Sequence, residues 1–292
     1  MTSFEALAHR VSSGDTMTDD DARMLLGSHD LIAIGMMGDE VRRRMHDRRT
    51  TFVRVLEIHA DAVPASLPPG VAPGEVRLVG DPGSVARARS AVHAARRLAA
   101  GVPLTGFSLA HLAAWGGTAS ETCAALREAG LDAIAEVPVD RLADAATVVA
   151  SARAAGVRVL RLTIDGGTGD DSIALVTRAA ALQRSLGGFE AFAPLPRQVP
   201  ASAPTTGYDD VKLVALARLM ATGIARIQVD WAIYGPKLAQ VALTVGADDV
   251  DGVAAGGGTL GPRRSPIEEI KNNILAAGLE PVERNGLFDR DE

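Results

Sequence analysis

Acidic side chains stand at the ends of several apolar, β-rich runs of this sequence. Glu57, His59 and Asp61 lie together at the end of the first run, and Glu136 and Asp165 end two later runs. Carboxylates grouped in this way can bind Mg²⁺ beside a phosphorylated substrate, and a histidine among carboxylates can ligate zinc for hydrolysis. The alternative is that they are solvated loop acids. Because the second half of the sequence has no histidine, we predict no metal site that draws imidazoles from later strands.

Cysteine and lysine usage disfavours several cofactor chemistries. The chain has one cysteine, Cys123, which rules out an intramolecular disulfide, a paired-cysteine zinc or redox site, and an iron–sulfur cluster held by three or four thiolates of this chain. Its helical spacing to Leu126 predicts a small, buried helix residue. Lys212 and Lys271 fall within predicted helices and Lys237 opens another, so a Schiff-base lysine at a strand end is disfavoured.

Composition also limits the partners. The formal net charge is -6 and aromatic residues make up 3% of the chain, so it lacks both the basic surface and the rings that nucleic acids require. No apolar run approaches the roughly 20 residues that cross a bilayer, and the sequence does not start with a basic-then-apolar leader. We therefore expect a soluble, cytoplasmic protein with no nucleic-acid partner and no membrane association.

The elements that must position these residues follow a repeating pattern. Eight β-rich runs alternate with helical stretches rich in Ala, Leu and Arg, which predicts an α/β fold, a (β/α)8 TIM-type barrel rather than a doubly wound sheet. The first unit is degenerate, because DAVPASLPPGVAPG at 61–74 holds four prolines where a helix could hardly form. The predicted strands are 52–58, 76–79, 102–107, 132–137, 157–164, 189–193, 226–231 and 248–253. The predicted helices are 83–100, 109–129, 141–155, 170–186, 208–222, 235–245 and 265–277.

The residues before the first strand are predicted to be helical. Thr18 precedes three aspartates, as a helix N-cap does, and an apolar stripe at helical spacing runs from Leu31 to Met45. We predict an N-terminal helical extension at 1–48 and a barrel at 49–292. Barrels of this kind carry their sites at the C-terminal ends of the strands, so the strand-end residues are expected to meet at one mouth.

Four segments in the second half resemble a known family. GGFEAFAPLPRQVP, DDVKLVALARLM, ARIQVDWAIYGPKLAQVALTVGADDVDGV and IEEIKNNILAAGLEPVERNGLF resemble, in sequence and order, the C-terminal half of the radical SAM enzymes of the futalosine route to menaquinone, aminofutalosine synthase in particular. DLIAIGMMGDEVRRRMHDRRTTFVR is similar to the family's entry into its first barrel strand. The resemblance covers about 15–60 and 75–288 and implies a radical SAM-like barrel.

The sequence departs from the family after the first strand. There the family carries Cys-x3-Cys-x2-Cys, whose thiolates hold a [4Fe–4S] cluster that binds S-adenosylmethionine. This chain has IHADAVPASLPPGVAPG instead. The turns that follow the second and fifth strands, VGDPGS and IDGGTGD, also differ from the family pattern. We therefore expect no [4Fe–4S] cluster and no other cofactor, and the binding of S-adenosylmethionine is doubtful.

The resemblance implies a substrate pocket faced by the last strands. In the family this pocket takes an enolpyruvyl ether of 3-hydroxybenzoate, so a small aromatic carboxylate or a nucleoside-like ligand is expected. The arginine would pair with a carboxylate, the aspartate would orient a hydroxyl or ribose, and the rings would pack on an aromatic ligand. The implied residues are Arg197, Asp230, Trp231, Tyr234, Lys237 and Gln240. The alternative is structural: Gly235 and Pro236 start a helix that packs on the barrel.

Three functions follow from these observations. The first is a cluster-less pseudoenzyme, an accessory or regulatory partner in menaquinone biosynthesis that forms a complex with a cysteine-complete paralogue. The second is a repurposed barrel enzyme whose acidic mouth supports non-radical, metal-assisted lyase or hydrolase chemistry. The third is family-like aminofutalosine synthase activity with cluster ligands supplied by a partner. Whether the chain is an enzyme stays open.

Overall fold

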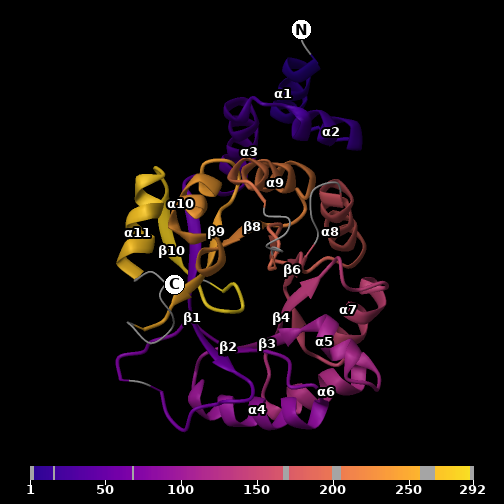
Figure 1. Cartoon of the computed structure of the whole chain (residues 1–292), viewed down its shortest axis with the longest axis vertical. Coiled ribbons are helices and arrows are strands. Elements are labelled where there is room, and N and C mark those ends of the chain that lie inside the picture. Colours follow the sequence, from indigo (N-terminus) through magenta and orange to yellow (C-terminus); the bar gives the residue numbers. More distant parts are fainter. Residues whose placement is uncertain are drawn as a thin grey trace.

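Parallel strands close into a barrel at the centre of the molecule (Figure 1). The computed structural model describes residues 3–15, 17–67, 69–166, 171–198, 205–256 and 267–289. The short strands β5 and β6 occupy one position, so the barrel has eight, and β1 pairs with both β2 and β9 to close it. The strands are β1 (Arg49–His59), β2 (Glu75–Val79), β3 (Leu104–Ser108), β4 (Ala133–Pro138), β5 (Arg158–Val159), β6 (Arg161–Thr163), β7 (Ala191–Ala193), β8 (Arg226–Asp230) and β9 (Asp249–Ala254). The predicted TIM-type barrel is confirmed.

Helices surround the barrel and precede it (Figure 1). The first three are α1 (Ser3–Ser13), α2 (Asp19–Gly27) and α3 (Leu31–His46), and β1 begins directly afterwards; the domain boundary at 48/49 stays a prediction. The others are α4 (Val85–Leu98), α5 (Leu109–Ala114), α6 (Ala119–Ala129), α7 (Ala145–Ala154), α8 (Ser172–Leu186), α9 (Gly207–Met220), α10 (Trp231–Leu243) and α11 (Ile267–Ala276). Between β1 and β2 the described residues form no helix, as the prolines predicted.

Two elements differ from the sequence prediction. The helix predicted over 109–129 is two helices, because Gly116 and Gly117 both take positive φ and a capping box of Thr118 with Glu121 starts α6. A further strand, β10 (Glu280–Glu283), pairs with the start of β1 outside the barrel. It is too short and too polar to be recognised from hydrophobic alternation.

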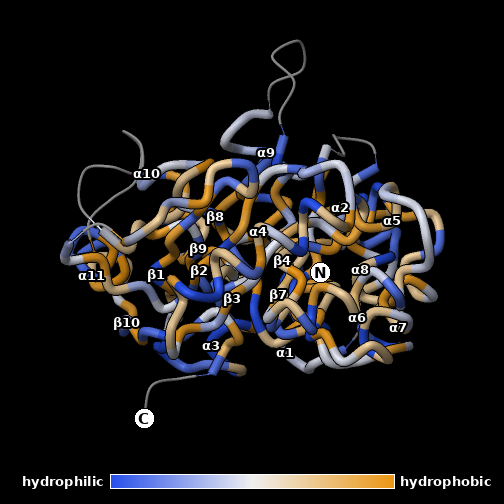
Figure 2. Tube along the Cα trace, turned by 90° about the horizontal axis from the view of Figure 1, so that it is seen from below, coloured by the Kyte–Doolittle hydropathy of each residue, from blue (hydrophilic) through white to orange (hydrophobic). Residues whose placement is uncertain are grey.

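The main hydrophobic core lies between the strands and the surrounding helices. Outward-facing strand residues such as Phe52, Leu78 and Ile227 belong to it, together with helix residues such as Val92 and Leu216. In Figure 2 the hydrophobic segments run mainly through the interior, along the strands, whereas the outer turns are mostly hydrophilic. The apolar core therefore coats the barrel rather than filling it.

Charged side chains fill the inside of the barrel. Near its N-terminal end, Arg284 donates from Nε and Nη2 to the two carboxylate oxygens of Asp249, at 2.6 and 2.7 Å. Gln228 Nε2 donates to the same carboxylate at 2.6 Å. Arg284 follows β10, and its guanidinium also stacks 4.0 Å over the ring of Phe288. Burial raises the pKa of Asp249, but the charge and hydrogen bonds of Arg284, the charge of Arg226 and the hydrogen bond from Thr51 together hold the pKa below its usual value.

A second group of charges lies one layer higher. Asp251 is fully buried and accepts two hydrogen bonds from Arg77 at 2.9 Å and a further one from Arg161. Arg77 also binds Glu75 through Nε at 2.7 Å and Nη2 at 2.9 Å. Burial raises the pKa of Asp251, yet Arg161 and Arg77 together hold it well below the usual value. The ionised carboxylate is thus stable here only because two arginines share it.

We predict that the arginine at the N-terminal end is needed for stability. Arg284→Ala leaves the charge of Asp249 buried without its partner, and the free energy of unfolding should fall by about 3 to 5 kcal/mol. Arg89→Ala, at an exposed position of α4, should change it by less than about 0.5 kcal/mol. Urea denaturation measures both.

A double variant separates lost charge pairing from lost packing. Asp249→Leu with Arg284→Met replaces both partners by apolar groups of similar volume, so most of the lost stability should return. If the double variant were as unstable as Arg284→Ala, the ion pair would not be the reason for the loss.

Candidate functional site

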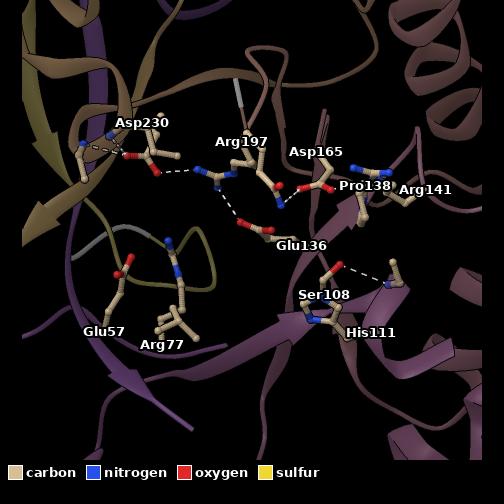
Figure 3. A pocket seen from close by; sticks show the side chains of 15 residues that line it. Glu57, Arg77, Ser108, His111, Glu136, Pro138, Arg141, Asp165, Arg197 and Asp230 are labelled. Atoms are coloured by element: carbon tan, nitrogen blue, oxygen red, sulfur yellow. Dashed lines mark hydrogen bonds and ion pairs between the residues drawn. The ribbon is translucent and has the colours of Figure 1, made fainter. Parts of the chain in front are cut away.

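A cavity of about 600 Å³ opens at the C-terminal ends of the strands (Figure 3). The side chains that line it come from the ends of β1 to β4, from the loops after β6 and β7, and from β8 and the start of α10. Its charged and polar lining residues are Glu57, Arg77, Ser108, His111, Glu136, Arg141, Asp165, Arg197, Gln198 and Asp230. Barrels place their sites at this end.

Arg197 holds the centre of this pocket. Its Nη1 lies 2.5 Å from Oδ2 of Asp230, and its Nη2 lies 3.0 Å from Oε1 of Glu136 (Figure 3). The contact with Glu136 is an ion pair without hydrogen-bond geometry, so Nε and Nη2 are buried N–H groups with no hydrogen-bond acceptor among the described residues. Burial lowers the pKa of Arg197, but Glu136, Asp230 and Asp251 raise it above its ordinary value. The guanidinium is a permanent cation, and its Nε and Nη2 groups have no hydrogen-bond acceptor among the described residues.

Asp230 joins this arginine to the start of α10. Its Oδ1 accepts from the backbone N–H groups of Ala232 at 2.8 Å and Ile233 at 3.1 Å, while Oδ2 faces Arg197. The neighbouring β9 has a bulge at Gly252, where its register with β1 shifts. A Cβ at Gly252 would lie 2.6 Å from Oδ1 of Asp230. The absence of a side chain there lets the carboxylate reach both partners.

Two further acids of the mouth, Asp165 and Glu136, also lie beside arginines. Asp165 accepts from Arg141 Nε at 2.8 Å and from Gln198 Nε2 at 3.1 Å. Burial raises the pKa of Glu136, but the charge of Arg197 and of two deeper arginines lowers it below the ordinary value. The carboxylates predicted at the strand ends thus share the mouth with arginines: Arg197 faces Glu136 and Asp230, and Arg141 binds Asp165.

The structure brings together some of the predicted residues and separates others. Glu57, Glu136, Asp165, Arg197 and Asp230 line the pocket. His59 and Asp61 do not, because they point to the outer side of the β1–β2 loop, where Asp61 binds Arg87 at 2.6 Å. Four members of the predicted ligand set also lie outside the lining: Trp231, Tyr234, Lys237 and Gln240.

The aromatic members of that set have structural contacts instead. Trp231 is fully buried in the core between the barrel and the helices. Tyr234 donates its hydroxyl to the carbonyl of Pro196 at 2.5 Å. Both residues belong to the first turn of α10, which ends in a kink at Gly235, and they orient this helix over the mouth. Their side chains hold the start of α10 in place beside the pocket but do not line the pocket.

Sequence reasoning missed Arg77, Ser108, His111 and Arg141. Arg77 could have been found, because Glu75 and Arg77 alternate with apolar residues in β2 and must therefore face the interior together. Ser108 is the last residue of β3, His111 lies in α5, and Arg141 lies in the loop after β4. No local pattern distinguishes these three from surface residues.

The thiol available for metal binding lies away from this pocket. Cys123 is buried in α6, and burial raises the pKa of its thiol to about 11. Metals bind the thiolate, and a cubane cluster needs three such ligands after β1, where the loop has none. The residues present do not fit a [4Fe–4S] cluster. Within the described ranges no group of three or more His, Cys, Asp and Glu side chains could hold a metal ion, and no described helix is long and apolar enough to cross a membrane.

The C-terminal part of the chain matches a known family. Residues 193–292 match the family described as the CofH/MqnC C-terminal region. The match includes β8, α10 and β9, and hence the side of the pocket that carries Arg197 and Asp230.

Curated relatives match over part of their length. Aminodeoxyfutalosine synthase of Thermus thermophilus is 36% identical over 126 residues, which are 38% of this chain and 34% of that protein. The 5-amino-6-(D-ribitylamino)uracil--L-tyrosine 4-hydroxyphenyl transferase 1 of Methanosarcina barkeri is 29% identical over 205 residues, 58% of this chain and 54% of that protein. The matches thus span about a third to a half of these relatives. Over that part the chain is homologous to radical SAM enzymes, and with one cysteine it lacks their cluster motif.

Solved structures share the whole fold. Methylornithine synthase (PylB) superposes with a TM-score of 0.67 at 16% identity, covering 94% of this chain and 97% of that one. The FeFe-hydrogenase maturase HydG from Carboxydothermus hydrogenoformans gives a TM-score of 0.68 at 13% identity, covering 98% and 80%. At such identities the likeness concerns the barrel alone.

We predict that a side chain at Gly252 disturbs the site. Gly252 and Gly83 both take positive φ, but a Cβ at Gly83 meets nothing within 4 Å. Gly83→Ala should cost only the backbone strain, about 1 to 2 kcal/mol of unfolding free energy. Gly252→Ala should cost more, because it also displaces the carboxylate of Asp230. Urea denaturation of the two variants measures the difference, and equal losses would show that Asp230 tolerates the methyl group.

A second prediction concerns the thiol. Because burial raises the pKa of Cys123 to about 11, the thiol is protonated and shielded at pH 8, and iodoacetamide should alkylate the folded protein very slowly. Alkylation should go to completion once guanidinium unfolds the chain. Mass spectrometry follows both, and fast modification of the native protein would place the thiol at the surface.

Proposed function

We propose that this chain is a cluster-less homologue of aminofutalosine synthase that binds a small aromatic carboxylate without radical chemistry. It acts as a pseudoenzyme, as an accessory or regulatory partner in menaquinone biosynthesis by the futalosine route. The observation that carries the proposal is the combination of a pocket around Arg197 with a β1–β2 loop that has no thiol.

The charges of the pocket support a carboxylate ligand. The Nε and Nη2 groups of Arg197 are buried N–H donors without acceptors among the described residues, and a ligand carboxylate would satisfy both in the bidentate manner that guanidinium favours. Burying such groups unpaired costs free energy that a ligand oxygen would recover.

The lining also supports a ligand of limited size with polar substituents. A volume of about 600 Å³ suits a substituted benzoate, since pockets for small molecules range upward from about 300 Å³. Glu57 and Glu136 line the same cavity and can accept hydrogen bonds from hydroxyl groups. The chemistry that this chain supplies is binding and orientation.

The two alternative functions have less support. A metal-assisted lyase or hydrolase would need free carboxylates, whereas Asp230 and Glu136 form ion pairs with Arg197 and Asp165 with Arg141. Family-like activity would need a partner to place three thiolates at the β1–β2 loop. A complex with a cysteine-complete paralogue remains part of the proposal, because a binding subunit without its own cluster needs a catalytic partner.

Reconstitution and binding assays test the proposal. After anaerobic incubation with iron and sulfide the chain should show no cluster absorption. Calorimetry with the enolpyruvyl ether of 3-hydroxybenzoate should show saturable binding, and a parallel titration with S-adenosylmethionine should show none. A stable cluster would overturn the cluster-less assignment, and a flat titration with the aromatic ether would overturn the assignment of the ligand.

Substitutions at Arg197 locate the binding. Arg197→Lys keeps the charge that Asp230 and Glu136 need but loses the planar fork, so affinity for the aromatic ether should fall about tenfold or more. Lys237→Gln removes a cation that lies outside the pocket lining and should leave affinity unchanged. Thermal unfolding of both variants checks their fold. Equal affinity in the wild type and Arg197→Lys would place the ligand elsewhere.

A further inference from the structure

A second cavity lies at the opposite end of the barrel. It has a volume of about 280 Å³ and is bordered by the end of α3, the start of β1, and the first residues of β8 and β9. This is the N-terminal face, away from the pocket of Arg197. Four arginines line it: Arg43, Arg44, Arg49 and Arg226.

The carboxylate in the floor of this cavity is already neutralised. Asp248 accepts hydrogen bonds from the buried Arg218 and from the backbone N–H of Ile227, the latter at 2.9 Å. His46 Nε2 lies 3.1 Å from the other carboxylate oxygen and 2.6 Å from the carbonyl of Ala225. The floor therefore presents little net negative charge to the cavity.

Two of the lining arginines have carboxylate partners outside the cavity. Arg43 binds Asp39 at 2.6 Å, and Arg226 binds Glu190 at 3.0 Å. The guanidinium of Arg226 is nearly buried, because its ion pair and the ring of Phe288, 5.4 Å away, cover it. These two arginines shape the cavity but carry balanced charges.

The other two cations have no carboxylate partner in the described part of the chain. Arg44 donates only to the carbonyls of Val11 and Ser12, at 2.7 and 3.2 Å, and Arg49 is exposed at the first position of β1. One carboxylate of the lining, Asp47, and the negative end of α3 oppose an anion here. Arg44 and Arg49 outweigh the single charge of Asp47, so a cationic excess remains.

The geometry points to a binding site for a phosphate-type dianion in this cavity. Arg44 and Arg49 border this cavity without a carboxylate partner among the described residues, and guanidinium groups bind the oxygens of a phosphate. The cavity is large enough for a phosphate with a small substituent. The site is separate from the pocket that we propose for the aromatic carboxylate. Its occupation would tie α3 to the barrel, because the lining residues come from both.

Calorimetry on the full chain tests this inference. Inorganic pyrophosphate should bind saturably and more weakly as salt is raised, because exposed charges are screened. Arg49→Gln should weaken that binding about tenfold, the effect of losing one hydrogen bond to a charged group. The Arg49 side chain is exposed and forms no ion pair or hydrogen bond within the part of the chain that the structure describes, so the variant should fold normally. Arg89→Gln, the same change in charge on the exposed face of α4, is the matched control.

Two sources could supply the phosphate, and vesicles distinguish them. Co-sedimentation with phosphatidic acid vesicles, but not with phosphatidylcholine vesicles, would identify a lipid headgroup; binding of pyrophosphate alone would identify a soluble ligand. Either result supports the site if Arg49→Gln weakens the binding about tenfold. No saturable binding of either probe, or an equal loss in Arg89→Gln, would overturn it. Neither outcome depends on the aromatic carboxylate.

Discussion

The interior of this barrel depends on the ion pairs that the buried carboxylate of Asp251 forms. An ionised aspartate without exposure is tolerated only where cations surround it, and Arg77 and Arg161 both bind it. Arg77 then needs Glu75 as a second partner. The buried charges of β9, β2 and β6 thus form one network of ion pairs. This network takes the place of the apolar layers that usually fill such a barrel. The free-energy cost of removing these charges from water is offset by the whole network rather than by single ion pairs.

The pocket is the upper continuation of this network. Arg197 lies 3.8 Å from Asp251 and reaches outward to Asp230 and Glu136, so the cation at the mouth is fixed from below and from both sides. Because its position is set by carboxylates, a ligand finds the guanidinium already oriented and loses little free energy in ordering it. The same carboxylates explain why acids at the strand ends do not form a free cluster for a metal ion.

The loop without thiols and the pocket wall that carries Arg197 and Asp230 belong to different strands. The loop after β1 has no thiol, and its described residues form no helix. The loop after β7, β8 and α10 fall in the region that matches the CofH/MqnC family. In a barrel each βα loop is attached to its own strand, and the strands are held by backbone hydrogen bonds and the outer core. A change in one loop therefore need not alter the pocket wall that another strand carries.

The sequence by itself determined the barrel, the missing first helix and the absence of cluster ligands, because these follow from periodicity, proline content and a count of one cysteine. It also put Arg197 and Asp230 at strand ends. Only the tertiary structure decided that Arg77 joins them, that Trp231 is core, and that Arg44 and Arg49 line one cavity at the other face. Such pairings join residues far apart in the chain, and the choice between an ion pair and a solvated charge depends on burial, which local patterns do not encode.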